Sequence, residues 1–128
     1  MTDRKKQLEM LATSFVHAFN NQDAETAMFI VADDAVFEDP RGGRHAGKDA
    51  IRKAFAPLFD GSLGSPYFSD DDLFIDADTG KVAASWELQI TVEGESKRLR
   101  GVDLLHFCGQ KLTRKLTYVK AETPLYLN

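Results

Sequence analysis

Two aspartates, Asp39 and Asp103, are the residues whose carboxylates could move a proton. Period-two alternation along an extended strand would surround Asp103 with apolar side chains on both faces. A carboxyl group placed there without a partner favours its protonated form. It could then donate a hydrogen bond to an oxygen on which negative charge develops. The alternative for this residue is a structural ion pair with a nearby arginine such as Arg100 or Arg114.

Asp39 lies at the exit of a short apolar stretch. Phe37 comes two positions before it, Pro40 follows it, and a loop with two glycines occupies residues 41–44. Aspartate before proline is a common turn signal. Taken alone, the residue therefore indicates a turn more readily than a catalytic base.

The histidines and acidic residues give no metal-binding pattern. His17, two residues after Phe15 on a predicted helix, is expected to point away from the side that carries Phe15, and His106 to lie on the strand face opposite Asp103. His45 falls in the glycine-containing loop, where a solvated position is favoured over one at the mouth of a pocket. The acidic run Asp70–Asp72 lacks the glycine and glutamate of a calcium loop. We therefore expect no metal and no other cofactor.

Composition and charge exclude several classes of protein. The chain has 128 residues, 43% hydrophobic and 28% charged, which is typical of one globular domain over residues 1–128. A net charge of −4 argues against a nucleic-acid-binding protein. No apolar run approaches the ~20 residues that span a bilayer, the N-terminus lacks a secretory pattern, and Cys108 is the only cysteine. The sequence predicts a cytoplasmic protein without a membrane segment.

The elements that must position the two aspartates are helices first and strands afterwards. Helical spacing of apolar residues predicts helices over residues 4–20, 25–34 and 47–59. Alternating and β-branched residues predict strands over residues 35–38, 65–76, 81–92, 97–107 and 112–120. This order is typical of an α+β fold with helices packed on one face of an antiparallel sheet. The register leaves open whether Trp86 or His106 lies on the outer face.

Three segments resemble the bacterial Δ5-3-ketosteroid isomerases. They are residues 14–40, which include Val-Ala-Asp-Asp-Ala-Val-Phe-Glu-Asp-Pro at 31–40, then residues 47–55 and 86–107. That family is part of the nuclear transport factor 2-like group, which includes the SnoaL-like proteins. The resemblance implies a cone-shaped, curved antiparallel sheet with three N-terminal helices enclosing a pocket, and a homodimer. The Asp-Asp-Ala-x-x-x-Asp-Pro segment is shared across the group, so it indicates the fold better than the substrate.

The resemblance also implies roles for single residues. Asp39 matches the general base of the isomerases, and Asp103 matches their neutral carboxylic acid that stabilises an oxyanion. Their catalytic tyrosine aligns with Phe15, which has no hydroxyl group. Losing one such donor typically costs ~10²–10³ in rate. The candidate apolar wall of the pocket is Phe15, Phe37, Phe55, Trp86, Leu105 and Phe107.

Two functions follow from these residues. The first is a cofactor-free proton-transfer enzyme of isomerase or cyclase type, acting on a small apolar carbonyl compound, with Asp39 as base and Asp103 as acid or oxyanion donor. The second is a non-catalytic module that binds a small ligand or dimerises, which Phe15 favours. They differ in whether Asp39 and Asp103 reach one cavity with a donor beside Asp103, or whether Phe15 and Trp86 fill it.

Overall fold

The computed structural model describes residues 3–123 and 126, apart from the side chains of Asp70 and Asp71. Its elements in chain order are α1 (Asp3–Asn20), α2 (Ala24–Ile30), β1 (Val31–Glu38), β2 (Arg44–Ala46), α3 (Lys48–Phe55), a 3-10 turn (Ala56–Leu58), β3 (Tyr67–Asp76), β4 (Lys81–Val92), β5 (Glu95–Cys108) and β6 (Lys111–Val119). Within the described ranges, no helix is both long and apolar enough to cross a membrane.

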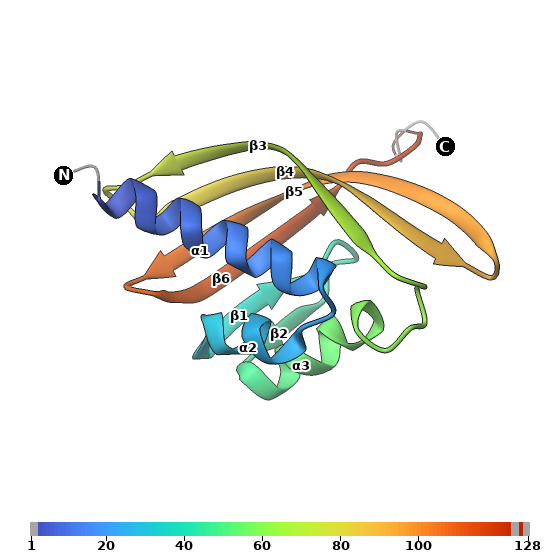
Figure 1. The fold of residues 1–128 in the computed structure, drawn as a ribbon, viewed down its shortest axis with the longest axis horizontal. Helices are drawn as coiled ribbons and strands as arrows, with labels where there is room; N and C mark the ends of the chain where they lie inside the picture. The colour runs from blue at the N-terminus through green and yellow to red at the C-terminus, as the bar shows by residue number, and fades with distance from the viewer. Residues whose placement is uncertain (1–2, 124–125, 127–128) are drawn as a thin grey trace.

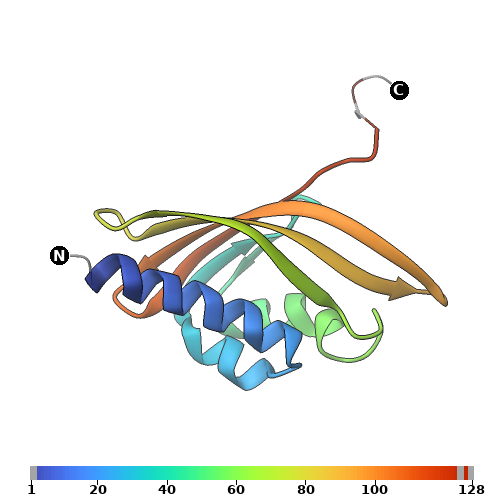
Figure 2. The same ribbon diagram turned by 45° about the horizontal axis from the view of Figure 1, so that its top comes forward.

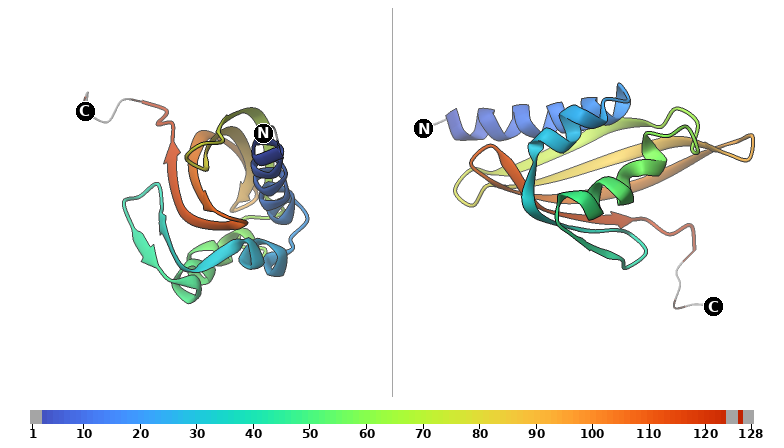
Figure 3. Two further views of the ribbon diagram at one scale, coloured as in Figure 1. Left: turned by 90° about the vertical axis from the view of Figure 1, so that its left-hand side faces the viewer. Right: turned by 90° about the horizontal axis from the view of Figure 1, so that it is seen from below.

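The strands form one six-stranded sheet in the order β2-β1-β6-β5-β4-β3 (Figure 1). Every neighbouring pair is antiparallel except β1 and β6, which run parallel. The sheet is strongly curved when it is viewed along its strands (Figure 3, left). All three helices lie on the concave side of the sheet (Figure 2), as the predicted α+β cone requires.

Helix α1 covers the concave face at β3 and β4. Its buried residues recur every three or four positions, which puts them on one stripe of the helix facing the sheet: Leu8, Ala12, Phe15, Ala18 and Phe19. The side chain of Asp23 caps α2 by accepting a hydrogen bond from Thr26 N at 3.1 Å. Gly47 precedes α3 with a φ of 90°, a conformation that favours glycine.

Phenylalanine rings fill the interior between α1, α3 and β1. Phe15 and Phe19 both pack edge-to-face on Phe55, with ring centroids 6.2 and 5.1 Å away. Phe37 of β1 approaches the same ring, at 5.1 Å. Such pairs add about 0.5–1.5 kcal/mol each beyond the burial of their surface. These ring contacts hold α1 and α3 against the end of β1, next to Asp39.

The predicted alternation along β5 is confirmed. Asp103 lies on the inner face with Leu105 and Phe107, and all three are buried. Trp86 of β4 is also buried on this side, whereas His106 points outward. The open question of which of the two lies on the outer face is thereby settled in favour of His106.

The structure corrects the sequence-based prediction at three places. Residues 31–34 belong to β1 and not to a helix, because Val31 pairs with Leu112 across a register shift in the parallel β1–β6 ladder. Residues 44–46 form the short strand β2 where a loop was expected. Regular α-helix in α3 ends at Phe55, because Pro57 in the following turn has no N–H to donate.

Candidate active site

The β1–β2 hairpin brings Asp39 and His45 together. Phe37 pairs with His45 across the hairpin, and Asp39 N donates to Gly43 O at 2.9 Å. Two residues beyond Phe37 on the same side, Asp39 is therefore diagonal to His45. Its Oδ2 lies 2.8 Å from His45 Nε2, and we refer to these two residues as the Asp39–His45 pair. Sequence reasoning missed the pair because it left β2 as a loop.

The other oxygen of Asp39 is held by the loop backbone. Arg41 N and Gly43 N donate to Oδ1 at 2.8 and 2.9 Å. The hydrogen bond from His45, and after it those from Gly43 and Arg41, hold the pKa of Asp39 below its usual range, although partial burial acts in the opposite direction. The carboxylate is therefore ionised at neutral pH.

Gly43 leaves room for this arrangement. A Cβ atom at that position would collide with Asp39 Oδ2 and would lie 3.2 Å from His45 Nε2. The imidazole ring of His45 also stacks on Phe37, with centroids 5.6 Å apart and ring planes 27° from parallel. A small loop residue and an aromatic neighbour together fix the geometry of the Asp39–His45 pair.

A second polar group lies on the inner face of β5 and β6. Lys115 Nζ is 3.3 Å from Asp103 Oδ1 and 2.6 Å from Thr117 Oγ1. Thr117 Oγ1 in turn donates to Asp103 Oδ1 at 2.7 Å. The side chains of Asp103 and Lys115 are each only 12% exposed. We call these three residues the Asp–Lys–Thr cluster.

Of the two interpretations of Asp103, the contacts support the ion pair over the carboxyl group without a partner. Its ionic partner is not one of the two arginines that the sequence suggested, because Arg114 pairs with Glu38 at 3.2 Å and Arg100 lies 3.5 Å from Glu87. The partner is Lys115. A charged residue in a strand is expected to be exposed, so the sequence did not indicate that Lys115 is buried.

A β-bulge in β6 explains why Lys115 was missed. The inward residues Leu112 and Lys115 are three positions apart, whereas a regular strand turns every second residue to one face. Phe107 pairs with Leu112 and His106 with Arg114, which leaves Thr113 as an extra residue. Strict alternation from Leu112 would have turned Arg114 inward and Lys115 outward.

A cavity of about 270 Å³ lies beside the ends of β1 and β6. Its lining residues are Glu38, Asp39, Pro40, Gly42, Leu116, Thr117, Tyr118 and Val119. Asp39 and Thr117 therefore both border one space, and the hydroxyl of Thr117 donates to Asp103 Oδ1 at 2.7 Å. Neither Phe15 nor Trp86 lines it. Asp103 itself lies behind Thr117, with donors on both Thr117 and Lys115 within reach.

The residues expected to form an apolar wall all lie on the inner side. Phe15, Phe37, Phe55, Leu105 and Phe107 share one buried cluster. Trp86 belongs to a second one with Leu88 and Ile90. Its indole N–H finds no partner among the described residues. Within the same part of the chain, no group of three or more histidine, cysteine, aspartate or glutamate side chains could hold a metal ion.

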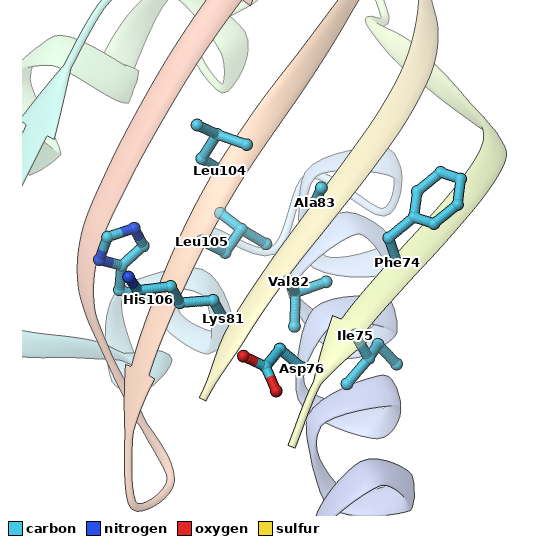
Figure 4. Close-up of a pocket in the computed structure, with 9 residues that line it drawn as sticks. All are labelled: Phe74, Ile75, Asp76, Lys81, Val82, Ala83, Leu104, Leu105 and His106. Carbon is cyan, nitrogen blue, oxygen red and sulfur yellow. The ribbon is translucent and has the colours of Figure 1, made fainter. Parts of the chain in front are cut away.

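A second cavity, of about 420 Å³, opens on the convex face of the sheet (Figure 4). Its lining residues come from three strands: Phe74, Ile75, Asp76, Lys81, Val82, Ala83, Leu104, Leu105 and His106. Burial, and to a lesser degree the charges of Lys81 and Arg114, lower the pKa of His106. This cavity is separated by the sheet from the inner face that carries Asp103.

The family follows from the sequence together with this fold. The model of the SnoaL-like domain matches residues 12–115, and the chain belongs to this family. No curated protein matches the chain. The fold is that of the nuclear transport factor 2-like proteins, the group that the sequence had suggested.

Solved structures with the same fold include three of bacterial origin. A candidate polyketide cyclase from Xanthomonas campestris pv. campestris is 18% identical, with 90% of this chain and 91% of that chain covered and a TM-score of 0.80. A nuclear transport factor 2-like protein from Mesorhizobium loti is 20% identical, with 92% of this chain and 94% of that chain covered and a TM-score of 0.78. A protein from Catenulispora acidiphila with a ketosteroid isomerase-like fold was solved with trimethylamine. It is 15% identical, with 84% of this chain and 83% of that chain covered and a TM-score of 0.75.

Proposed function

We propose that the protein is a cofactor-free proton-transfer enzyme of isomerase or cyclase type, acting on a small apolar carbonyl compound. One observation carries the proposal: Asp39, ionised and fixed by three hydrogen bonds, faces a cavity that also reaches the Asp–Lys–Thr cluster through Thr117. A base and a group of hydrogen-bond donors around one space are the two parts that an enolisation needs.

Asp39 has one acceptor position left for a substrate. A carboxylate offers about four lone-pair sites. Both sites on Oδ1 accept backbone N–H groups, and one site on Oδ2 is engaged with His45. The remaining site on Oδ2 would accept the proton from the carbon next to the substrate carbonyl. The C–H electron pair then moves into an enolate, and Asp39 returns the proton to another carbon.

The carbonyl oxygen would be received on the other side of the cavity. Neighbouring strands lie about 4.8 Å apart, and Phe37, two residues before Asp39, pairs with Lys115, two residues before Thr117. Asp39 and Thr117 are therefore close enough for one small ketone to contact both sides. The buried phenylalanines behind them would exclude water from an apolar ring system.

Proton exchange on a simple ketone tests this function. We would incubate the protein with 1-tetralone in D₂O and follow the loss of the α-proton signals by NMR. The protein should accelerate exchange above buffer, and Asp39→Asn should remove ~10²–10⁴ of that acceleration. His17→Gln, an exposed change on α1, is the matched control and should exchange as the wild type does. Equal rates for Asp39→Asn and the wild type would contradict the role of Asp39.

A non-catalytic ligand-binding module is the second candidate, and Phe15 favours it. Phe15 carries no hydroxyl group and is packed within the phenylalanine core. Binding of 1-tetralone, detected by the fluorescence of the only tryptophan, Trp86, without exchange above buffer would select this candidate.

We also propose that the protein forms a homodimer through the convex face of the sheet. Phe74 is 66% exposed there, beside the cavity that Leu104 and His106 line. A contiguous exposed apolar patch commonly marks a contact with another protein, and Phe74 would form its centre. Sedimentation or light scattering of the intact chain measures the oligomeric state directly.

A further inference from the structure

We propose that Lys115 donates the hydrogen bond to the carbonyl oxygen of the ligand, and that Asp103 and Thr117 hold its ammonium group in position. This inference rests on the proposed function, because it names the group that receives the oxygen. In this inference Asp103 is a positioning residue. The sequence had suggested that Asp103 itself donates the hydrogen bond to the oxygen. The substrate class is then an apolar ketone whose oxygen points toward β6 and whose α-carbon faces Asp39.

The hydrogen-bond capacity of Lys115 is the first reason. An ammonium group has three N–H donors. Within the described residues, two polar atoms accept from it, Asp103 Oδ1 at 3.3 Å and Thr117 Oγ1 at 2.6 Å. The third N–H is free to donate to a ligand.

The aromatic rings around the ammonium group are the second reason. Lys115 Nζ lies 4.5 Å from the centroid of the Phe37 ring and 5.6 Å from that of Phe55. Both rings belong to the buried apolar cluster of the inner face. In surroundings with few competing water molecules, a fixed cation stabilises developing negative charge more strongly than in bulk water.

The cost of burying this ion pair is the third reason. Taking two charges out of water is often no better for stability than placing apolar residues of similar size there. Lys115 and Asp103 are both almost nine-tenths buried on a strand face that is otherwise largely apolar. The Asp–Lys–Thr cluster therefore contributes little to stability. Its presence is explained if the ammonium group of Lys115 binds a ligand.

Thr117 gives the ligand a route to the ammonium group. Thr117 lines the cavity with Asp39, and its hydroxyl accepts from Lys115 at 2.6 Å. Since Thr117 uses its only proton for Asp103, it cannot itself donate to a ligand oxygen. The ammonium group of Lys115, which donates to that hydroxyl, is a donor directly beside it.

The test compares two probes that differ in one oxygen, 2-acetylnaphthalene and 2-ethylnaphthalene. Binding is measured by Trp86 fluorescence, and 2-acetylnaphthalene labelled with carbon-13 at the carbonyl reports the hydrogen bond by NMR. The wild type should prefer the ketone by ~10-fold or more and should shift its carbonyl resonance downfield. Lys115→Met should lose both the preference and the shift while still binding 2-ethylnaphthalene.

Two further variants keep the test decisive. Lys115→Met leaves Asp103 buried without its cation and could unfold the protein, so Lys115→Met/Asp103→Leu removes both charges together. Lys111→Met is the matched control, because Lys111 is also on β6 but its ammonium group lies 3.9 Å over the ring of Phe29, an exposed residue. It should keep the ketone preference of the wild type. An unchanged preference and resonance in a folded Lys115 variant would overturn the inference.

The exchange of 1-tetralone separates this inference from the proposed function. Loss of Lys115 should slow exchange by ~10²–10³. If the wild type exchanges and the Lys115 variants exchange equally fast, the inference fails and the proposed function stands. If nothing exchanges while ketone preference still depends on Lys115, the proposed function fails and Lys115 remains the ligand-binding donor.

Discussion

Asp103 and Thr117 face each other directly across β5 and β6, with their side-chain oxygens 2.7 Å apart. The bulge at Thr113 creates this pairing, because it changes which residues of β6 point inward. Deletions of single residues of β6 before Thr117 should therefore differ in cost according to whether they keep Thr117 opposite Asp103.

Deleting Thr113 should be tolerated, and deleting Leu116 should not. The first deletion removes the extra residue and the bond from its hydroxyl to His106 O, at a cost of about 0.5–1.5 kcal/mol. The second turns Tyr118 inward in place of Thr117 and leaves the cluster incomplete, at a cost of about 1–3 kcal/mol for that loss alone. Urea unfolding followed by Trp86 fluorescence measures both. If the two deletions lowered the free energy of unfolding equally, the register that places Thr117 opposite Asp103 would not be important for stability.

Acid should destabilise the protein through Asp39. Its folded pKa lies below the unfolded value of ~3.9, so the stabilisation is fully present above that value and is lost as the pH falls through the folded pKa. His45→Phe keeps a ring beside Phe37 but removes the largest cause of the shift, so the pKa of Asp39 should rise toward its usual value. Carbon-13 NMR of the carboxylates checks this. His17→Phe, on exposed helix surface, should leave Asp39 unchanged.

Gly101→Ala should strain the inner face at the Trp86 end of the sheet. A Cβ atom there would lie 2.6 Å from Cζ2 of Trp86 and would collide with the carbonyl oxygen of Tyr118. Overpacking of this kind costs about 1–3 kcal/mol. A lowered unfolding midpoint with a shifted Trp86 emission is expected. Ser96→Ala, exposed on the same strand, should stay within about 0.5 kcal/mol of the wild type.

Phe74→Glu should give a monomer if the convex face joins two copies. The new charge would enter the apolar contact and lose its water there without a partner. Met10→Glu, an equally exposed position on α1, should leave the oligomeric state unchanged. Light scattering of the three proteins at one concentration gives the answer. A wild-type monomer at every concentration would contradict the proposed dimer.

Local patterns predicted the elements well, and long-range pairing limited the prediction of the site. The face on which Asp103 lies follows from alternation within β5, which depends only on neighbouring residues. Its partner Lys115 points inward only because of a β-bulge, and no residue type in β6 predicts that bulge. His45 was missed for a related reason: β2 has only three residues, too few for a periodic signal, and it forms because β1 is there to pair with it.

The parallel pairing of β1 with β6 has a consequence for how the protein folds. Glu38 and Arg114, which form an ion pair across these strands, are 76 positions apart in the chain. Contacts of such high sequence separation form late, because closing the long loop between them costs entropy first. Asp39 and His45 can meet within their own hairpin, but the cavity has no second wall until β6 docks. We therefore expect a ligand of this cavity to bind only the completed fold, and to stabilise it by mass action without hastening any earlier step.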